Sequence, residues 1–342
     1  MAARRYFRLG VPTVIGCVLA WALIHTGLVQ NLAASDITRS SWLRDVAETD
    51  GSIRGVALAT SRLLVTFDKK LGSNYNTSLW TMPVEISASL AILLGVTLAR
   101  RAGEGGLRTL GIVSGFLAAA WIGSYCSLFA FGIMLRLAPP RRVLRHIATR
   151  RWVFWGLCMI ALFCLSVPYS ATRWPIYQTA ANFSVHIIWR TRVWVHTAES
   201  FWHAIGTMVA ILLVQASDRI QALLCRPAGR FLGRISFPLY ILNAPILTVV
   251  LCGVIVLGHR LGAGALLTTL VAYLLFVATA LVAAAAATPM MEDCVIAWAA
   301  KVGDRVDRAC GACTSASLRL MVRRAEVARL NVSSNSMQRK DE

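Results

Sequence analysis

Acidic side chains are scarce in this sequence, and charge of either sign is low. Charged residues make up 15% of the chain, whereas hydrophobic residues make up 57%. A soluble domain is nearer about a quarter charged and about half apolar. The apolar residues are also gathered into blocks instead of being spread evenly. The shortage of charge therefore favours a lipid bilayer as the solvent over a large soluble core.

Other absences narrow the possible functions. The net charge is +19, yet no signature of a nucleic-acid-binding fold is present, so no nucleic acid partner is expected. The lone C-x-x-C, Cys310 to Cys313, has no second pair or nearby histidine, and the six histidines lack metal-ligand or Ser-His-Asp spacing. We therefore expect neither a metal nor a bound cofactor. Without an internal repeat, nothing favours the duplicated architecture of many transporters.

Eight apolar runs alternate with polar segments, and they predict an all-α, polytopic transmembrane helix bundle of about eight spans. A span needs about 20 apolar residues to cross about 30 Å of hydrocarbon, and the shorter runs need tilt or burial among neighbours. The predicted domain covers residues 1–300, with an outer loop at 30–79 that carries short amphipathic helices. A basic, partly disordered cytoplasmic tail follows at 301–342. The runs are 10–29, 80–98, 107–122, 125–138, 153–169, 201–214, 237–258 and 263–287.

The distribution of basic residues predicts the orientation. With a cytoplasmic amino terminus, 25 of the 35 lysines and arginines fall in inside segments, as the positive-inside rule requires. Both termini are then cytoplasmic.

Segment 107–138 fits either one long helix or a hairpin turning at Gly123-Ser124, and the hairpin keeps the next arginine cluster inside. Arg4-Arg5 also fits a cleaved signal ending at Cys17, but the apolar run continues to Val29, which suits a span better.

Three groups of polar residues are candidates for chemistry. Glu85 is the one carboxylate inside a predicted span, where an ionisable group costs on the order of 3 kcal/mol. It either faces an internal cavity and orients a base or cation, or lies near the interface, hydrated or paired with an arginine. Tyr240 and Asn243 are three residues apart and share a helix face. Either both side chains bind a buried ligand, or Tyr240 lies at the membrane interface and Asn243 forms a hydrogen bond to a neighbouring helix. Arg5 and Arg8 either hold phosphates through bidentate contacts or only mark topology.

Together, three segments resemble the acyltransferase-3 family of bacterial membrane O-acyltransferases over roughly residues 4–300. R-R-Y-F-R-L-G-V-P (Arg4–Pro12) is similar to the family's basic segment ahead of a span. S-L-W-T-M-P-V-E (Ser78–Glu85) matches a second motif with Met82 in place of leucine. G-R-I-S-F-P-L-Y-I-L-N-A-P (Gly233–Pro245) matches a third, with Asn243 in place of histidine.

The resemblance implies a helical enzyme of the bacterial inner membrane that moves an acetyl-like group from an acyl-CoA-type donor, as co-substrate, to a hydroxyl, usually on a carbohydrate. It implies a catalytic role for Glu85 and contacts from Arg5 and Arg8 to the donor phosphates. The substrate cavity would be lined by Trp80, Ser236, Tyr240 and Asn243.

Two departures from the family pattern leave the activity open. The family's first helix carries an Arg and a His separated by ten residues, and this sequence starts at the segment that follows the family's second helix. We therefore expect two helices to be absent, through a start assigned too late or a truncated gene. Asn243 can form hydrogen bonds but cannot accept a proton near neutral pH. The alternative is a catalytically inactive relative that acts as a membrane binding or assembly partner.

Overall fold

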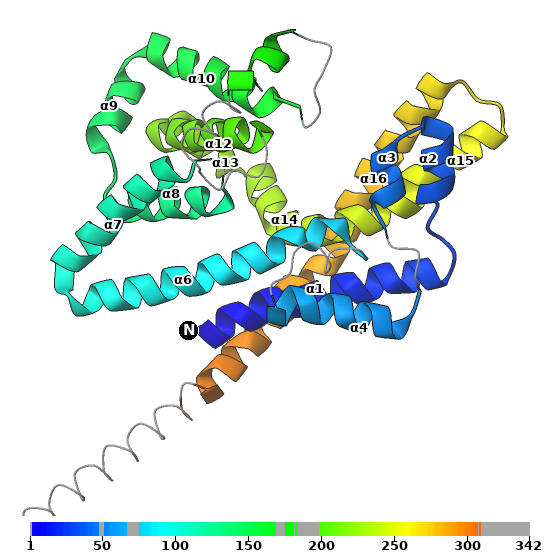
Figure 1. Ribbon diagram of the computed structural model, residues 1–342, viewed down its shortest axis with the longest axis horizontal. Helices are drawn as coiled ribbons and strands as arrows, with labels where there is room; N and C mark the ends of the chain where they lie inside the picture. Colours follow the sequence, from blue (N-terminus) through cyan, green and yellow to red (C-terminus); the bar gives the residue numbers. More distant parts are fainter. Residues whose placement is uncertain are drawn as a thin grey trace, which may run out of the picture.

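Helices form all the regular structure in the described part of this computed structural model (Figure 1). The structure describes residues 2–47, 51–66, 75–122, 124–168, 175–180, 182–183, 198–306 and 308. The predicted all-α class is confirmed in these residues. Most of the predicted tail, from residue 309 onward, lies outside them.

Each of the eight apolar runs forms a helix, as predicted. In chain order they are α1 (Ala2–His25), α6 (Met82–Arg101), α7 (Gly103–Ala120), α8 (Tyr125–Leu137), α10 (Arg151–Ser166), α12 (Ala198–Ala216), α14 (Pro227–Ile246) and α16 (Ala265–Thr288). α14 continues through a π-helical turn, η3 (Leu247–Leu251), into α15 (Cys252–Arg260). α16 continues through a second π-helical turn, η4 (Pro289–Cys294), as far as Val306.

Among the described residues, five helices are long and apolar enough to cross a membrane. A sixth candidate is the pair formed by α9 (Arg141–Thr149) and α10, which is bent by 105°. α8 has only 13 residues, about 20 Å of helix, and α7 carries Glu104 and Arg108 in its first two turns. Of the eight expected spans, α7 and α8 are therefore the two that fall short of this length and composition.

α7 and α8 pack against each other as a hairpin. The backbone turns between Trp121 and Ser124, whose N–H donates to the Trp121 carbonyl at 2.9 Å. A Cβ atom on Gly111 would lie 2.9 Å from the Leu137 Cβ, so glycine permits this close approach. The hairpin reading of segment 107–138 is confirmed.

Short helices form in the described parts of the segment between α1 and α6, as predicted. They are α2 (Asn31–Thr38), α3 (Ser41–Asp45), α4 (Ile53–Ser61), the π-helical turn η1 (Arg62–Thr66) and the 3₁₀ turn η2 (Thr77–Thr81). Ala34 of α2 and Leu43 of α3 pack on Cys252 and Ile255 of α15. α4 packs on α1, where Val56 and Ala59 contact the same core as Cys17.

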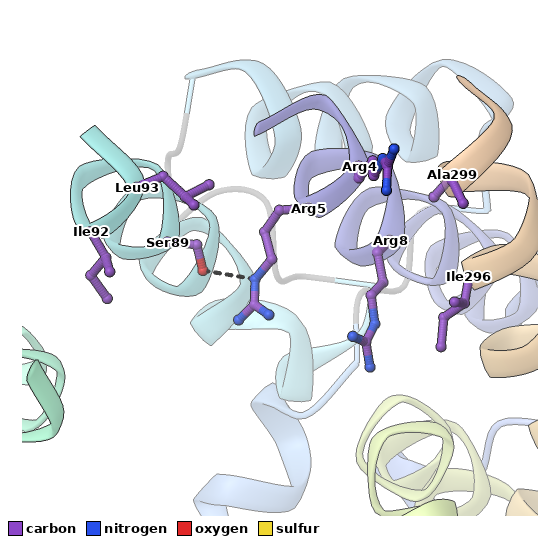
Figure 2. A pocket seen from close by; sticks show the side chains of 9 residues that line it. Arg4, Arg5, Arg8, Ser89, Ile92, Leu93, Ile296 and Ala299 are labelled. Atoms are coloured by element: carbon purple, nitrogen blue, oxygen red, sulfur yellow. Dashed lines mark hydrogen bonds between the residues drawn. The ribbon is translucent and has the colours of Figure 1, made fainter. Parts of the chain in front are cut away.

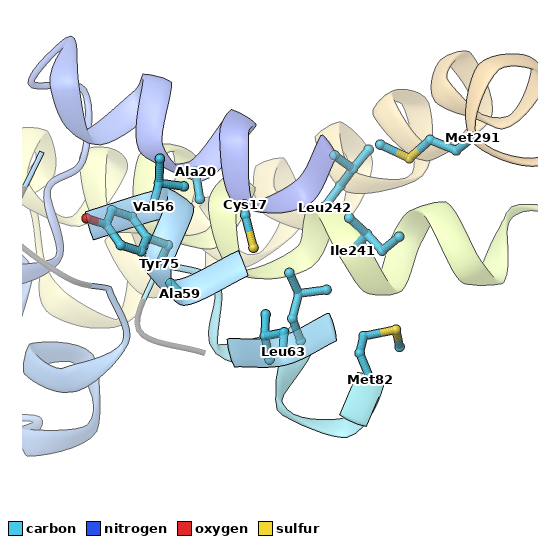
Figure 3. Close-up of a cluster of buried hydrophobic side chains, with 11 residues drawn as sticks. Cys17, Ala20, Val56, Ala59, Leu63, Tyr75, Met82, Ile241, Leu242 and Met291 are labelled. Atoms are coloured by element: carbon cyan, nitrogen blue, oxygen red, sulfur yellow. The ribbon is translucent and has the colours of Figure 1, made fainter. Parts of the chain in front are cut away.

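The main core forms where α1, α4, η2, α14 and η4 meet (Figure 3). Cys17, Leu79, Met82 and Ile241 are fully buried there. A separate apolar cluster joins α8 to α7 and α12, and another joins α9 to α10 and α12. Outside these cores, long helices carry exposed apolar side chains, with Leu266 86% and Phe116 73% exposed. Such surfaces suit contact with lipid better than contact with water.

Candidate functional site

The entry to α6 holds the first group of candidate residues. Asn76 accepts a hydrogen bond from the Ser78 N–H at 3.1 Å and so starts the 3₁₀ turn η2. Pro83 follows in the first turn of α6, where its missing N–H costs no helical hydrogen bond. Thr81, Glu85 and Ser89 are then spaced by four residues, so they lie in a row along one face of the helix.

A buried hydrogen bond fixes α14 against this turn. Pro245 has no N–H, so the carbonyl of Ile241, four residues earlier, loses its usual helical donor. The Asn76 side-chain amide replaces that donor, with Nδ2 lying 2.8 Å from the Ile241 oxygen, and both residues are fully buried. One residue earlier on α14, the Tyr240 hydroxyl lies 2.7 Å from Thr81 Oγ1. Sequence reasoning missed Asn76 because its role depends on a proline far away in the chain.

A hollow of about 550 Å³ lies between α1, α6 and the helix that follows η4 (Figure 2). Arg5 Nε donates to Ser89 Oγ at 3.1 Å. Arg8 lies 3.5 Å from a carboxylate oxygen of Glu292, and Arg4 forms an ion pair with Asp304. Among the described residues, no carboxylate lies within ion-pair distance of Arg5. The hollow is lined by Arg4, Arg5, Arg8, Ser89, Ile92, Leu93, Ile296, Ala299 and Ala300.

A second hollow, of about 280 Å³, surrounds Glu85. The Trp80 and Tyr125 rings stand on one side, with centroids 4.9 Å apart. Glu85 is half-buried and forms no ion pair with any described residue. The hollow is lined by Trp80, Thr81, Val84, Glu85, Tyr125, Leu128 and Phe129.

A third hollow, of about 390 Å³, lies between α14 and α16. Ser236, Tyr240 and Asn243 all line it, so the predicted shared helix face of Tyr240 and Asn243 is present. The Asn243 side chain is exposed there. The Ser236 hydroxyl donates to the Gly233 carbonyl of its own helix at 2.8 Å. Phe276 and Val277 of α16 close the opposite wall.

The structure does not bring the expected residues into one cavity. Trp80 and Glu85 lie in one hollow, Ser236, Tyr240 and Asn243 in another, and Arg5 and Arg8 in a third. The Thr81–Tyr240 bond joins the second hollow to the third. The Arg5–Ser89 bond lies within the first hollow, one helical turn along α6 from Glu85. The i, i+4 spacing around Glu85 is the sequence signal that could have identified Thr81 and Ser89.

These groups supply guanidinium charge, one carboxylate and several hydroxyls. Guanidinium groups suit bidentate contacts with phosphate, and a carboxylate suits orientation of a hydroxyl or ammonium. No cluster of three His, Cys, Asp or Glu residues that could hold a metal ion occurs in the part of the chain that the structure describes.

Long apolar helices with polar groups held between them define a polytopic helical membrane protein. Residues 1–288 match the family model described as the acyltransferase domain of the acyltransferase-3 type, and the chain belongs to this family. The resemblance drawn from the three sequence segments is therefore confirmed. No curated protein and no solved structure gave a significant match.

Proposed function

We propose that this membrane protein transfers an acetyl-like acyl group from an acyl-CoA-type donor to a hydroxyl, in most cases on a carbohydrate. The acceptor oxygen forms a bond to the thioester carbonyl carbon, and the carbon–sulfur bond breaks. The proton of the acceptor hydroxyl is transferred to the departing thiolate, so that CoA leaves as a thiol. Membership of the acyltransferase-3 family supports the acyl-transfer class.

The observation that carries the proposal is the adjacency of a basic hollow and a carboxylate on α6. Ser89 holds Arg5 at one hollow, and Glu85 lies one helical turn away in the next. A donor whose phosphates contact Arg5 and Arg8 would extend its acyl end toward Glu85. The first hollow, at about 550 Å³, falls within the range of small-molecule sites.

Glu85 is proposed to orient the attacking hydroxyl. The Trp80 and Tyr125 rings beside it offer flat apolar faces with polar edges, which suits a sugar. Ser236, Tyr240 and Asn243 are proposed to contact substrate in the hollow between α14 and α16. The Thr81–Tyr240 hydrogen bond would hold the two hollows in a fixed relation.

The family suggests a bacterial inner-membrane location, and the distribution of basic residues supports an orientation with both termini in the cytoplasm. Under this orientation, Arg5 and Arg8 lie at the cytoplasmic end of α1, where a CoA-type donor is available. The three arginines of the hollow, Arg4, Arg5 and Arg8, would then both orient the chain in the membrane and bind the donor.

A second candidate function is binding without turnover. The observation that favours it is Asn243, which stands where the family has a histidine and cannot take up a proton. A positioned general base contributes about 10²–10⁴-fold to such a reaction. A chain lacking that base would bind donor or acceptor as an assembly partner.

The test is release of free CoA thiol by the purified chain in lipid nanodiscs, given acetyl-CoA and a panel of glycosides. Glu85→Gln should lower acceptor-dependent release by on the order of 10²-fold, the lower end of the range for a positioned acid or base. Glu104→Gln is the matched control, because Glu104 is exposed in the first turn of α7. A Glu85→Gln variant that releases CoA as fast as the wild type would contradict the role of Glu85.

Donor binding is measured separately by titration with acetyl-CoA. Arg5→Gln should weaken binding by about 10-fold, since a hydrogen bond to a charged group contributes about 1.5–3 kcal/mol. Arg101→Gln, an exposed charge at the end of α6, should leave it unchanged. Binding without release would favour the second candidate, and the absence of both would overturn both functions.

A further inference from the structure

Six arginines lie close together in the chain from the end of α8 to the start of α10, and none of them pairs with a carboxylate that the structure describes. The chain has no Asp or Glu from residue 105 to residue 198. All six side chains are exposed, and none takes part in an ion pair with a described residue. They are Arg136, Arg141, Arg142, Arg145, Arg150 and Arg151. No described carboxylate neutralises these six charges, so they are available to an anionic partner.

The helix that carries half of these arginines lies across the ends of two others. α9 is bent by 105° from α10, so it runs nearly at right angles to that helix (Figure 1). Ile147, 3% exposed, anchors α9 on Ala161 of α10 and Leu213 of α12. Arg141, Arg142 and Arg145 are exposed on the rest of α9. If α10 and α12 cross the bilayer, α9 lies along its surface.

Two tryptophans at the start of α10 indicate where this helix meets the boundary between hydrocarbon and headgroups. Trp152 and Trp155 are 70% and 65% exposed at the start of α10, and their spacing of three puts them on one face. Tryptophan is enriched where the hydrocarbon meets the headgroups, because its ring is apolar and its N–H is polar. Because α9 directly precedes α10 in the chain, its arginines would therefore lie near the level of the lipid phosphates.

We propose that α9 and the start of α10 bind the headgroups of anionic phospholipids. This surface, called the α9 surface below, consists of Arg141, Arg142, Arg145, Trp152 and Trp155. Charge complementarity identifies the occupant, since guanidinium groups bind phosphate in a bidentate manner and an anionic leaflet attracts clustered basic residues. A basic amphipathic helix with aromatic neighbours is also the pattern of an interfacial helix. The proposal does not depend on acyl transfer, because α9 and the hollow at Arg5 lie on different helices.

The test uses the purified full chain in a neutral detergent, titrated with phosphatidylglycerol while the melting temperature is followed. Phosphatidylglycerol should raise it, and phosphatidylcholine should raise it less. Changing Arg141, Arg142 and Arg145 together to Gln should shift the titration midpoint to roughly 100-fold higher lipid, because each basic residue near an anionic surface contributes about a factor of five. The same three residues changed to Lys should keep most of the response.

The matched control changes Arg219, Arg226 and Arg230 to Gln, which removes equal charge from exposed positions around α13 (Asp218–Leu224). Its midpoint should stay near the wild-type value. The wild-type response should also fall in 0.5 M salt, since exposed charges are screened. If the Gln variant does not fold, this salt measurement on the wild type tests the proposal in its place. Equal responses to the two lipids, a Gln variant that matches the control, or a wild-type response that salt leaves unchanged would overturn the proposal. Glycerol 3-phosphate or an oligonucleotide that reproduced the shift at the same concentration would also overturn it.

Discussion

The hydroxyl oxygens of Tyr240 and Thr81 lie 2.7 Å apart, although 159 positions separate the two residues in the chain. This bond joins the middle of α14 to the end of η2, immediately before α6. Two of the segments that resembled the acyltransferase-3 family are therefore held together by their own side chains. The contact also places the hollow around Glu85 beside the hollow that Asn243 lines.

Tyr240→Phe should destabilise the protein by about 0.5–1.5 kcal/mol, the usual net contribution of one intramolecular hydrogen bond. The ring still fills its space, so the loss reports the hydroxyl alone. Tyr273→Phe on α16 removes a hydroxyl from a side chain that is 58% exposed and should change little. Denaturant unfolding in detergent, followed by tryptophan fluorescence, measures both. Equal stability of the two variants would show that the bond to Thr81 contributes nothing.

Asn76→Ala should cost about 1–3 kcal/mol, because it leaves the buried carbonyl of Ile241 without a donor. Pro245→Ala restores a backbone N–H that can donate to the same carbonyl. Asn76→Ala should therefore cost less in the Pro245→Ala background than in the wild type. A double-mutant cycle measures this coupling, which we expect to be about 0.5 kcal/mol or more. If the two substitutions change the free energy of unfolding additively, the Asn76 amide does not replace the backbone N–H that Pro245 lacks.

Gly16→Ala should destabilise the protein by about 1–3 kcal/mol, the usual cost of overpacking a core. The added Cβ would lie 2.6 Å from Cγ2 of Ile241, which is fully buried. Gly10→Ala on the same helix is the control, because its Cβ would meet Leu64 at an ordinary 3.6 Å. That control should be neutral or slightly stabilising, since alanine favours a helix interior over glycine. Thermal unfolding of the two variants side by side distinguishes these outcomes.

Hydropathy and charge predicted most of the fold. Continuous apolar runs have one stable solution in lipid, the helix, because every backbone group must be satisfied internally. The start of α14 was missed by ten residues, since a proline, two glycines and Arg230 interrupt the apolar residues of Pro227–Gly233, so that no continuous apolar run marks this part of the helix. α9 was predicted only as part of a basic loop. Its helix depends on Ile147 packing against α10 and α12, which sequence spacing does not reveal.

The candidate site could be predicted less completely. Glu85, Tyr240 and Asn243 were identifiable because polar groups stand out within apolar runs. Their division between hollows depends on how α14 crosses η2, and that crossing is set by the contact between Asn76 and Ile241. Such long-range partners leave no periodic pattern in one sequence.

The helix from Ala265 to Val306 is unbroken over 42 residues, which corresponds to roughly 63 Å at about 1.5 Å per residue. The hydrocarbon layer is only about 30 Å thick, so at least a third of this long helix must extend beyond it. Asp293 and Asp304 lie on the last two-fifths of the helix, where they pair with Arg234 and Arg4. Under the proposed orientation the hollow beside Arg5, which Ile296 and Ala299 of this helix also line, therefore lies at the membrane surface and is open to water.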